Sequence, residues 1–262
     1  MKIFLREKTI VLSDHPQSSN SKKDFTVAFH SKKQLKKVFQ NFAKNEKATN
    51  LIIYSEPPKT NTQQDIDYDQ PLLPDKPGKN LISSFLSLFK IIEAAGGFVK
   101  NQRGEYLFIF RRGKWDLPKG KIIVCRAGSE EAKGWQTDKG SLGLPAGGDK
   151  AKAKIKEPYD KAAMREVMEE TGLYDIRIIR ELPRTFHIYM QHRKWILKPT
   201  TWFEMYAPDN QTLIPEEKED ISEVRWFTFD EMRIIKENTY PSIRELLSNY
   251  ELQMNSDQEG DF

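Results

Sequence analysis

The chain has 262 residues, of which 38% are hydrophobic and 11% aromatic, enough for the core of one large domain or two modest ones. The formal net charge of +4 is a small difference between 42 basic and 38 acidic residues, which does not favour a protein that coats nucleic acids, and we expect no nucleic-acid partner. The single cysteine excludes an internal disulfide, and no segment approaches the roughly 20 apolar residues of a membrane span, so we expect a cytoplasmic protein without a membrane partner.

Residues 1–90 are predicted to form a small α+β N-terminal domain of unknown role. Its expected strands are short apolar runs bounded by polar residues: Lys2–Leu5, Thr9–Leu12, Phe25–Phe29 and Leu51–Tyr54. Ser31 is a candidate N-cap for a helix in which apolar residues recur at helical spacing: Leu35, Val38, Phe39 and Phe42. This part of the sequence contains no recognisable chemical motif.

A linker or loop is expected at residues 56–79, which are rich in Pro, Asp, Gln and Lys. A helix is expected to follow from about Leu81 to Glu93, with Gly96 and Gly97 ending it.

The remainder of the chain is predicted to be a mixed sheet with helices packed on its faces. The expected strands are Phe98–Lys100, Tyr106–Phe110, Ile176–Leu182, Thr185–Met190, Thr200–Tyr206 and Val224–Phe227. The expected helices are Tyr159–Thr171, Phe229–Lys236 and Ser242–Tyr250. Residues 251–262 are polar and net acidic, which predicts a disordered tail.

The chemically informative segment is Arg165–Leu173, with the sequence REVMEETGL. Residues three and four apart share a face of a helix, so Glu166, Glu169 and Glu170 place three carboxylates on one side of about one turn. Like charges this close repel each other, and carboxylate oxygens are the ligands that Mg²⁺ or Mn²⁺ prefers. A solvated acidic helix face would explain the glutamates, but not their placement between an arginine and a glycine.

A further glutamate precedes this segment, separated from it by seven residues. The whole pattern resembles the Nudix box of the Nudix hydrolases. The matching positions are Glu157, Arg165, Glu166, Val167, Glu169, Glu170, Gly172 and Leu173. The resemblance covers roughly residues 91–250. It implies a Nudix α/β/α sandwich, α+β in class, and an enzyme that cleaves a pyrophosphate linkage in a nucleoside diphosphate joined to another group.

The box departs from the family pattern at its start, because its usual opening glycine is replaced by Ala151. Upstream, Arg112–Lys121 (RGKWDLPKGK) is very similar to the opening of many Nudix boxes, with Gly120 as the box glycine. A rival opening is Leu144–Gly148 (LPAGG), which lacks the tryptophan and the preceding strand. We favour Gly120, which implies an insertion at about residues 122–152. That insertion is either a recognition loop or a passive insert, and a surface loop of this length costs little closure entropy.

The resemblance also implies roles for individual residues. Glu166, Glu169, Glu170 and the carbonyl of Gly120 are the expected ligands of a Mg²⁺ or Mn²⁺ cofactor. The expected catalytic residues are Glu169, Glu166 and Arg165, of which Arg165 orients a glutamate by a charge-assisted hydrogen bond. Glu157 is either a metal ligand, a partner of Arg165, or a charge that favours the helix N-terminus. Glu219 is a possible additional base in a downstream acidic loop.

Substrate-binding candidates are basic and aromatic residues near the expected cleft. Phosphate contacts are expected from cations near the box: Arg111, Arg112, Lys119, Lys121 and Lys198. Strand residues of the diadenosine-polyphosphate-type Nudix enzymes resemble the segments around Tyr189 and Lys198, which implies that Tyr189 stacks on a base. For each of these positions an ordinary surface or core role is the competing interpretation.

Three functions remain open from the sequence. The first is hydrolysis of a long-chain nucleotide such as a dinucleoside polyphosphate, a branch that includes the diphosphoinositol polyphosphate hydrolases. The second is the same chemistry on a modified nucleoside triphosphate or a nucleotide sugar. The third is a Nudix-fold module that senses a nucleotide without turnover. A homodimer is compatible with all three.

Overall fold

The computed structural model describes residues 1–17, 21, 23–55, 80–126, 129–130, 135 and 154–259. The predicted linker at 56–79 and the rival box opening at 144–148 lie outside the described residues. The chain divides into two compact units, Met1–Ile91 with Phe186–Lys198, and Ile92–Thr185 with Pro199–Phe262. The sequence placed residues 186–198 with the later domain, and the structure assigns them to the first unit.

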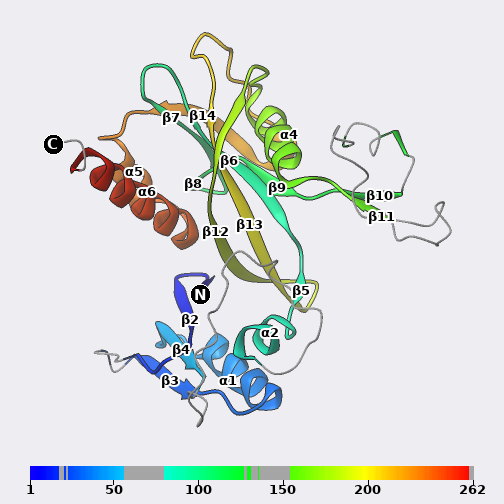
Figure 1. Ribbon diagram of the computed structural model, residues 1–262, viewed down its shortest axis with the longest axis vertical. Coiled ribbons are helices and arrows are strands. Elements are labelled where there is room, and N and C mark those ends of the chain that lie inside the picture. Colours follow the sequence, from blue (N-terminus) through cyan, green and yellow to red (C-terminus); the bar gives the residue numbers. More distant parts are fainter. Residues whose placement is uncertain are drawn as a thin grey trace. The chain divides into compact units, whose positions relative to one another are not determined.

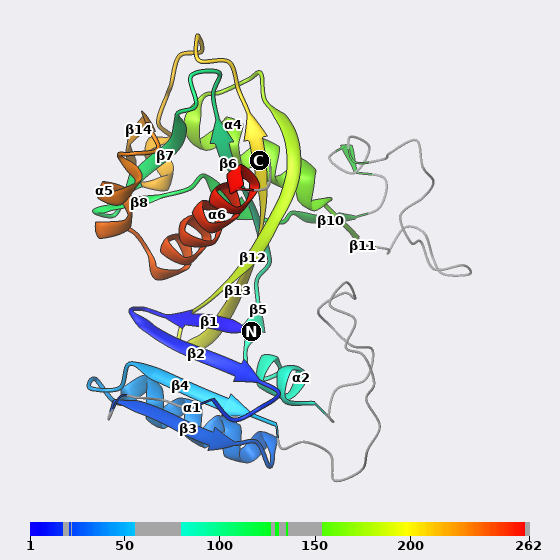
Figure 2. The same cartoon turned by 60° about the vertical axis from the view of Figure 1, so that its left-hand side comes forward.

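The first unit is a sheet with one long helix, as the sequence predicted (Figure 2). Its strands follow the order β1-β2-β4-β3 and comprise β1 (Lys2–Leu5), β2 (Lys8–Ser13), β3 (Asp24–Ala28) and β4 (Asn50–Tyr54). The helix α1 (Lys32–Lys44) begins after Ser31, whose hydroxyl accepts a hydrogen bond from the backbone N–H of Gln34. Leu35, Phe39 and Phe42 form its buried stripe.

The hairpin tip at residues 186–198 completes this unit. Its first strand pairs in parallel with β1, with Phe4 opposite His187. Ile188 and Leu197 join the same apolar core as α1. Long-range strand pairing, which no local pattern reveals, therefore decides where these residues belong.

The helix expected at 81–93 is much shorter in the structure. Helix α2 spans Leu81–Leu86, and strands β5 (Lys90–Ile91) and β6 (Ala94–Lys100) follow it. Gly96 and Gly97 lie inside β6 and end no helix. A Cβ on Gly96 would meet Pro118 O at 2.5 Å, and one on Gly97 would meet Val167 Cγ2 at 2.6 Å. These glycines allow a neighbouring turn and a helix to approach the strand closely, so they do not signal a helix end.

The second unit is built on a mixed sheet with the central order β14-β7-β6-β13-β12. Its strands are β6, β7 (Tyr106–Arg111), β8 (Lys114–Asp116), β9 (Lys119–Lys121), β12 (Arg177–Gln191), β13 (Lys194–Tyr206) and β14 (Ile221–Phe227). Strands β6 and β13 run parallel, whereas β7 is antiparallel to β6, β8 and β14. The two strands predicted at 176–190 are one continuous strand, β12.

Helices cover both faces of this sheet (Figure 1). Phe98 and Phe108 pack with Leu246 and Tyr250 of the helix α6 (Pro241–Glu259) in one apolar cluster. Their neighbours Val99 and Leu107 pack with helix α4 (Tyr159–Thr171) in another. Successive strand residues point to opposite faces, so this alternation builds an α/β/α sandwich of the α+β class, as predicted.

Shorter elements complete the second unit. They are β10 (Val124–Arg126), β11 (Lys154–Lys156), a 3₁₀ turn at Glu217–Glu219 and helix α5 (Met232–Glu237). Strands β10 and β11 pair with each other in an antiparallel ladder. No helix in the described ranges is long and apolar enough to cross a membrane.

The disordered tail predicted at 251–262 is wrong for most of its length, because α6 continues to Glu259. An ion pair between Glu251 and Lys236 of α5 and the packing of Met254 against the apolar cluster hold this extension. Both contacts are with residues of the folded unit, and the polar composition of the segment gave no sign of them.

Candidate active site

Helix α4 carries the acidic segment and has the bounds that the sequence predicted. Pro158 stands at its N-cap, and buried Ala162, Ala163 and Val167 direct one face toward the sheet. At the other end Gly172 adopts a left-handed conformation with φ of 78°, and its N–H donates to Met168 O at 3.0 Å. The polar face of the helix, with its glutamates, is thereby held at a defined angle to the sheet.

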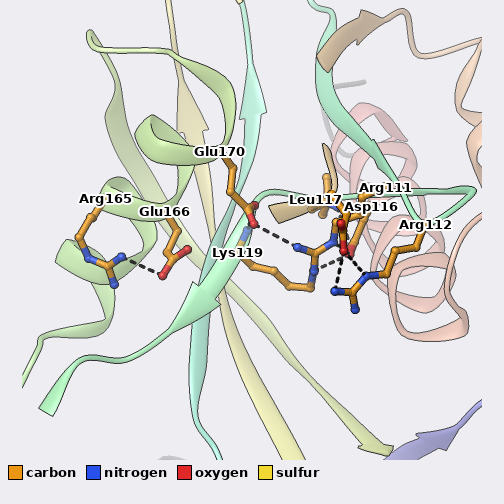
Figure 3. A network of polar contacts seen from close by, with 9 residues as sticks. Arg111, Arg112, Asp116, Leu117, Lys119, Arg165, Glu166 and Glu170 are labelled. Atoms are coloured by element: carbon orange, nitrogen blue, oxygen red, sulfur yellow. Dashed lines mark hydrogen bonds and ion pairs between the residues drawn. The ribbon is translucent and has the colours of Figure 1, made fainter. Parts of the chain in front are cut away.

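Arg165 bonds three acids on this face, and Figure 3 shows its contact with Glu166. Its guanidinium holds Glu157 in a two-point contact, Nε to Oε1 at 2.8 Å and Nη2 to Oε2 at 2.9 Å. Its Nη1 donates to both Glu166 at 2.8 Å and Glu169 at 2.9 Å. The hydrogen bond with Glu157 is the main reason that the pKa of Arg165 is raised. The predicted orienting role of Arg165 agrees with this geometry.

Glu157 is a buried partner of Arg165. It is 2% exposed, and its Oε2 also accepts a hydrogen bond from the backbone N–H of Ile123 at 3.1 Å. Each of its carboxylate oxygens therefore has at least one donor within the protein. Of the alternatives that the sequence left open for Glu157, the contacts favour the partner of Arg165.

Gly120 lies directly against the carboxylate of Glu166. A Cβ on Gly120 would come within 1.9 Å of Glu166 Oε2, closer than any real contact allows. Gly120 belongs to β9, which pairs with β6 and packs beside α4. The segment that opens the box and the helix that ends it therefore meet at this glycine, which supports Gly120 as the box glycine.

Glu170 turns to a different set of partners. Its carboxylate accepts the backbone N–H of Lys119 at 2.7 Å and Nη1 of Arg111 at 3.1 Å (Figure 3). The residue is 2% exposed. Burial raises the pKa of Glu170 to about 7 in spite of the charges of Lys119 and Arg111.

Asp116 is a buried acid beside Glu170 that the sequence did not single out. It is 1% exposed and pairs with Arg111 Nε at 3.2 Å and with Lys119 Nζ. Burial alone would raise the pKa of Asp116, but the charges of Lys119 and Arg111 outweigh it and lower the pKa. The available signal was the position of Asp116 between the tryptophan and the lysine of WDLPKGK, three residues before Lys119.

The structure corrects the expectation that Glu166, Glu169 and Glu170 gather at one point. In the ranges that the structure describes, no three acidic, histidine or cysteine side chains are arranged to hold an ion. Arg165 holds two of these carboxylates, whereas Arg111 and a backbone N–H hold the third. Hydrogen bonds to Arg165 on one side and to Arg111 and the Lys119 N–H on the other relieve the repulsion between these carboxylates.

The donor set still fits a hard divalent cation by its chemistry. Carboxylate and carbonyl oxygens are the ligands that Mg²⁺ and Mn²⁺ take in proteins. The contact of Gly120 with Glu166 places the backbone of the box opening beside one of these carboxylates. The residues that would hold the cation are Glu166, Glu169, Glu170 and the carbonyl of Gly120.

The basic residues near the box that were predicted to contact phosphate differ in exposure and in their partners. Arg112 is exposed and pairs with Asp220 through Nε and Nη2, at 3.1 and 3.0 Å. The ammonium of Lys119 is largely buried against Asp116, and burial lowers its pKa. Lys121 has an exposed side chain, and its carbonyl accepts Nη2 of Arg165 at 3.2 Å.

The remaining predicted site residues are Glu219, Tyr189 and Lys198. Glu219 is exposed in the 3₁₀ turn. Burial lowers the pKa of Arg111, but the charges of Asp116 and Glu170, with a smaller contribution from Glu219, outweigh burial and raise it. Tyr189 and Lys198 belong to the first unit, whereas α4 and Gly120 belong to the second. The site described above therefore includes neither Tyr189 nor Lys198.

The family model of the NUDIX domain matches residues 122–250. These residues are a Nudix domain. The match includes Glu157 and all of α4, and it identifies a hydrolase that acts on pyrophosphate bonds of nucleoside diphosphate derivatives. It begins two residues after Gly120 and spans the segment of the rival opening, so the choice between the two openings depends on the contact of Gly120 with Glu166.

Several solved Nudix structures resemble this Nudix chain at a low level. An Ap4A hydrolase from C. elegans in a binary complex has a TM-score of 0.40 and 16% identity, with 63% of this chain and 98% of that chain covered. The MutT protein from Methanosarcina mazei Go1 has a TM-score of 0.39 and 17% identity, with 66% and 98% covered. A NUDIX hydrolase from Nitrosomonas europaea has a TM-score of 0.39 and 19% identity, with 63% and 90% covered. Scores this low carry no argument about substrate, and no curated protein matches the chain.

Proposed function

We propose that this Nudix hydrolase is metal-dependent and cleaves a phosphoanhydride bond in a dinucleoside polyphosphate or a related nucleotide. The observation that carries the proposal is the double role of Arg165. One guanidinium anchors to buried Glu157 and holds both Glu166 and Glu169, so the two carboxylates are positioned before any ligand arrives. Preorganised charges of this kind are what a hydrolytic site requires.

The proposed division of roles follows from these contacts. A bound Mg²⁺ or Mn²⁺ supplies charge neutralisation on the phosphate oxygens and acidifies a water. Glu166 and Glu169 both bond Arg165, but the Glu166 side chain is 14% exposed and that of Glu169 is 55% exposed. This exposure supports Glu169 as the residue that orients or deprotonates the attacking water. Glu219, an exposed acid of the 3₁₀ turn, stays the alternative base.

The support for the substrate class comes from the box opening. WDLPKGK and the residues around Tyr189 and Lys198 resemble the diadenosine-polyphosphate branch more than other Nudix enzymes. A substrate with a long phosphate chain also suits a site bordered by basic side chains such as Arg111, Arg112 and Lys121. Hydrolysis of modified nucleoside triphosphates is the alternative reaction, and nucleotide sensing without turnover is the alternative outside catalysis.

A substrate panel tests the proposal. The purified chain is incubated with dinucleoside polyphosphates, nucleoside triphosphates and nucleotide sugars, with Mg²⁺ and then with Mn²⁺, and the products are separated by chromatography. We expect metal-dependent cleavage, with the highest kcat/KM for a dinucleoside polyphosphate. Preference for a modified triphosphate would contradict the substrate assignment. Binding of a nucleotide without cleavage in either metal would favour the sensing module.

Two substitutions connect the activity to the box. We expect Glu169→Gln and Glu170→Gln to abolish turnover while the far-UV circular dichroism spectrum is retained, because each removes one negative charge from the metal-binding set. Glu181→Gln is the matched control, since Glu181 is an exposed acid of β12 that makes a long ion pair with Arg184, at 3.7 Å. Wild-type rates in both box variants would refute the assignment of the site.

A further inference from the structure

Four charged residues, two from the box opening, one from β7 and one from α4, form a closed ring of contacts. Arg111 donates through Nε to Asp116 at 3.2 Å and through Nη1 to Glu170 at 3.1 Å. Lys119 donates through Nζ to Asp116 and through its backbone N–H to Glu170 at 2.7 Å. Each cationic residue therefore bridges the same two acids (Figure 3).

The ring is buried and balanced in charge. The side chains of Asp116 and Glu170 are each 2% exposed, and those of Lys119 and Arg111 are 10% and 17% exposed. Buried charges cost several kcal/mol each unless they are paired, and here two acids meet two bases. Removing one acid would leave two cationic side chains to share the other.

The ring also controls the opening of the box. Asp116 accepts the backbone N–H of Leu117 at 2.9 Å in addition to its two ion pairs, which fixes the start of the turn that leads to Gly120. Lys119 immediately precedes Gly120, whose backbone lies against Glu166. A change at Asp116 would therefore reach Glu170 through Arg111 and Lys119, and Gly120 through the turn.

We infer that Asp116 is a positioning residue of the box: it shares the positive charges of Arg111 and Lys119 with Glu170, so that a divalent cation meets less competition for the Glu170 carboxylate. This inference rests on the proposed function. Without the Asp116 carboxylate, both cationic side chains would depend on Glu170 for neutralisation and would compete with the metal for it. Asp116 itself touches neither metal nor substrate in this scheme.

The inference predicts an order of metal affinities among charge variants. Asp116→Asn leaves one acid and two cations, and we expect its Kd for Mn²⁺ to rise by about 10- to 100-fold, as for other residues that position metal ligands. Lys119→Met leaves two acids and one cation, and we expect its Kd to be equal to or below the wild-type value. The double variant restores the balance, and its Kd should lie between those of the two single variants.

The measurement is Mn²⁺ binding by isothermal titration calorimetry and by electron paramagnetic resonance of free Mn²⁺, with no substrate present. Thermal unfolding of each variant is recorded in parallel. Glu204→Gln is the matched control, because Glu204 is a mostly buried acid of the same unit that bonds Arg180 and Tyr250. This variant should lose stability without a change in Mn²⁺ affinity.

The outcomes separate the two proposals. If the wild-type chain neither binds Mn²⁺ nor cleaves any nucleotide, the proposed function falls and this inference falls with it. If the wild type binds Mn²⁺ but Asp116→Asn binds it equally well, only the inference is overturned. A double variant that binds Mn²⁺ more weakly than both single variants would also overturn the inference, because Asp116 would then act through stability alone. If Asp116→Asn does not fold, two other results still overturn the inference. One is a Kd for Lys119→Met above the wild-type value, and the other is a Kd for Lys119→Met equal to that of the double variant.

Discussion

The carboxylate of Glu166 occupies the space that a side chain on Gly120 would need. Both of its oxygens would lie within 2.1 Å of a Cβ built on that glycine. The two residues are far apart in the sequence, and their contact joins the opening of the box to its helix. Space, and not backbone conformation, is what requires glycine at this position, because residue 120 is not among the residues with positive φ.

Gly120→Ala is expected to displace the Glu166 carboxylate and to break its hydrogen bond with Arg165, which would destabilise the fold by about 1–3 kcal/mol. In a Glu166→Ala background the same substitution should cost much less, because the clashing carboxylate is gone. Urea unfolding of the four proteins measures this coupling. Equal costs in both backgrounds would show that the clash lies elsewhere.

Arg165→Met is expected to lower the free energy of unfolding by about 3–5 kcal/mol, because it leaves the buried Glu157 carboxylate without its cation. Arg165→Lys should recover part of this loss, since lysine keeps the charge but lacks the planar fork. The control is Arg112→Met, which breaks a pair whose side chains are 70% and 63% exposed and should cost less than about 1 kcal/mol. Similar losses at positions 165 and 112 in chemical denaturation would contradict the anchoring role of Glu157.

The raised pKa of Glu170 predicts a pH dependence of stability in the absence of divalent cations. Its pKa is about 7 in the folded protein against a reference value of 4.5, so between these values the folded state binds more protons than the unfolded state. Its contribution is therefore fully present below pH 4.5 and is lost as the pH rises through 7. The free energy of unfolding of the wild type should fall by up to about 3 kcal/mol relative to Glu170→Gln over this range. Urea unfolding in chelator at pH 5 and pH 8 provides the measurement, and parallel curves for the two proteins would contradict the assignment.

The same titration predicts that metal binding tightens as the pH rises through 7, since a carboxyl group must lose its proton to become a ligand. Calorimetric titration with Mn²⁺ at pH 6 and pH 8, in buffers of different ionisation enthalpy, measures both the affinity and the protons released. We expect close to one proton released at pH 6 and fewer at pH 8. Release that is independent of pH would show that Glu170 does not bind the metal.

Replacement of residues 127–153 by a short turn tests the insertion. Arg126 and Lys154 face each other in the β10–β11 ladder, so a short turn is able to connect them. We expect loop closure itself to change the free energy of unfolding by less than about 1 kcal/mol, because its cost depends only weakly on length. Any larger loss would come from removal of Trp135, which is 9% exposed. Relative kcat/KM values across the substrate panel should change several-fold. A large loss of melting temperature with unchanged specificity would argue against a recognition role.

Local signals in the sequence determined the acidic helix and the class of chemistry. Pro158 before the first turn, Gly172 after the last and the apolar repeat between them all act within a few residues, and the structure has the helix at the predicted bounds. The α+β sandwich followed from alternating strands and helices in the same way. The spacing of the charged residues in α4 likewise indicated a Nudix box before any contact was known.

The tertiary structure decided which partner each charge has. The Glu170 carboxylate accepts the backbone N–H of Lys119, a residue 51 positions away. Glu170 therefore has different partners from Glu166 and Glu169 on the same helix. Gly96 and Gly97 form a strand because a turn and α4 pack closely against them. Residues 186–198 join the first unit through pairing with β1. Contacts between distant segments depend on packing and burial of charge, and the order of residues along the chain carries little information about either.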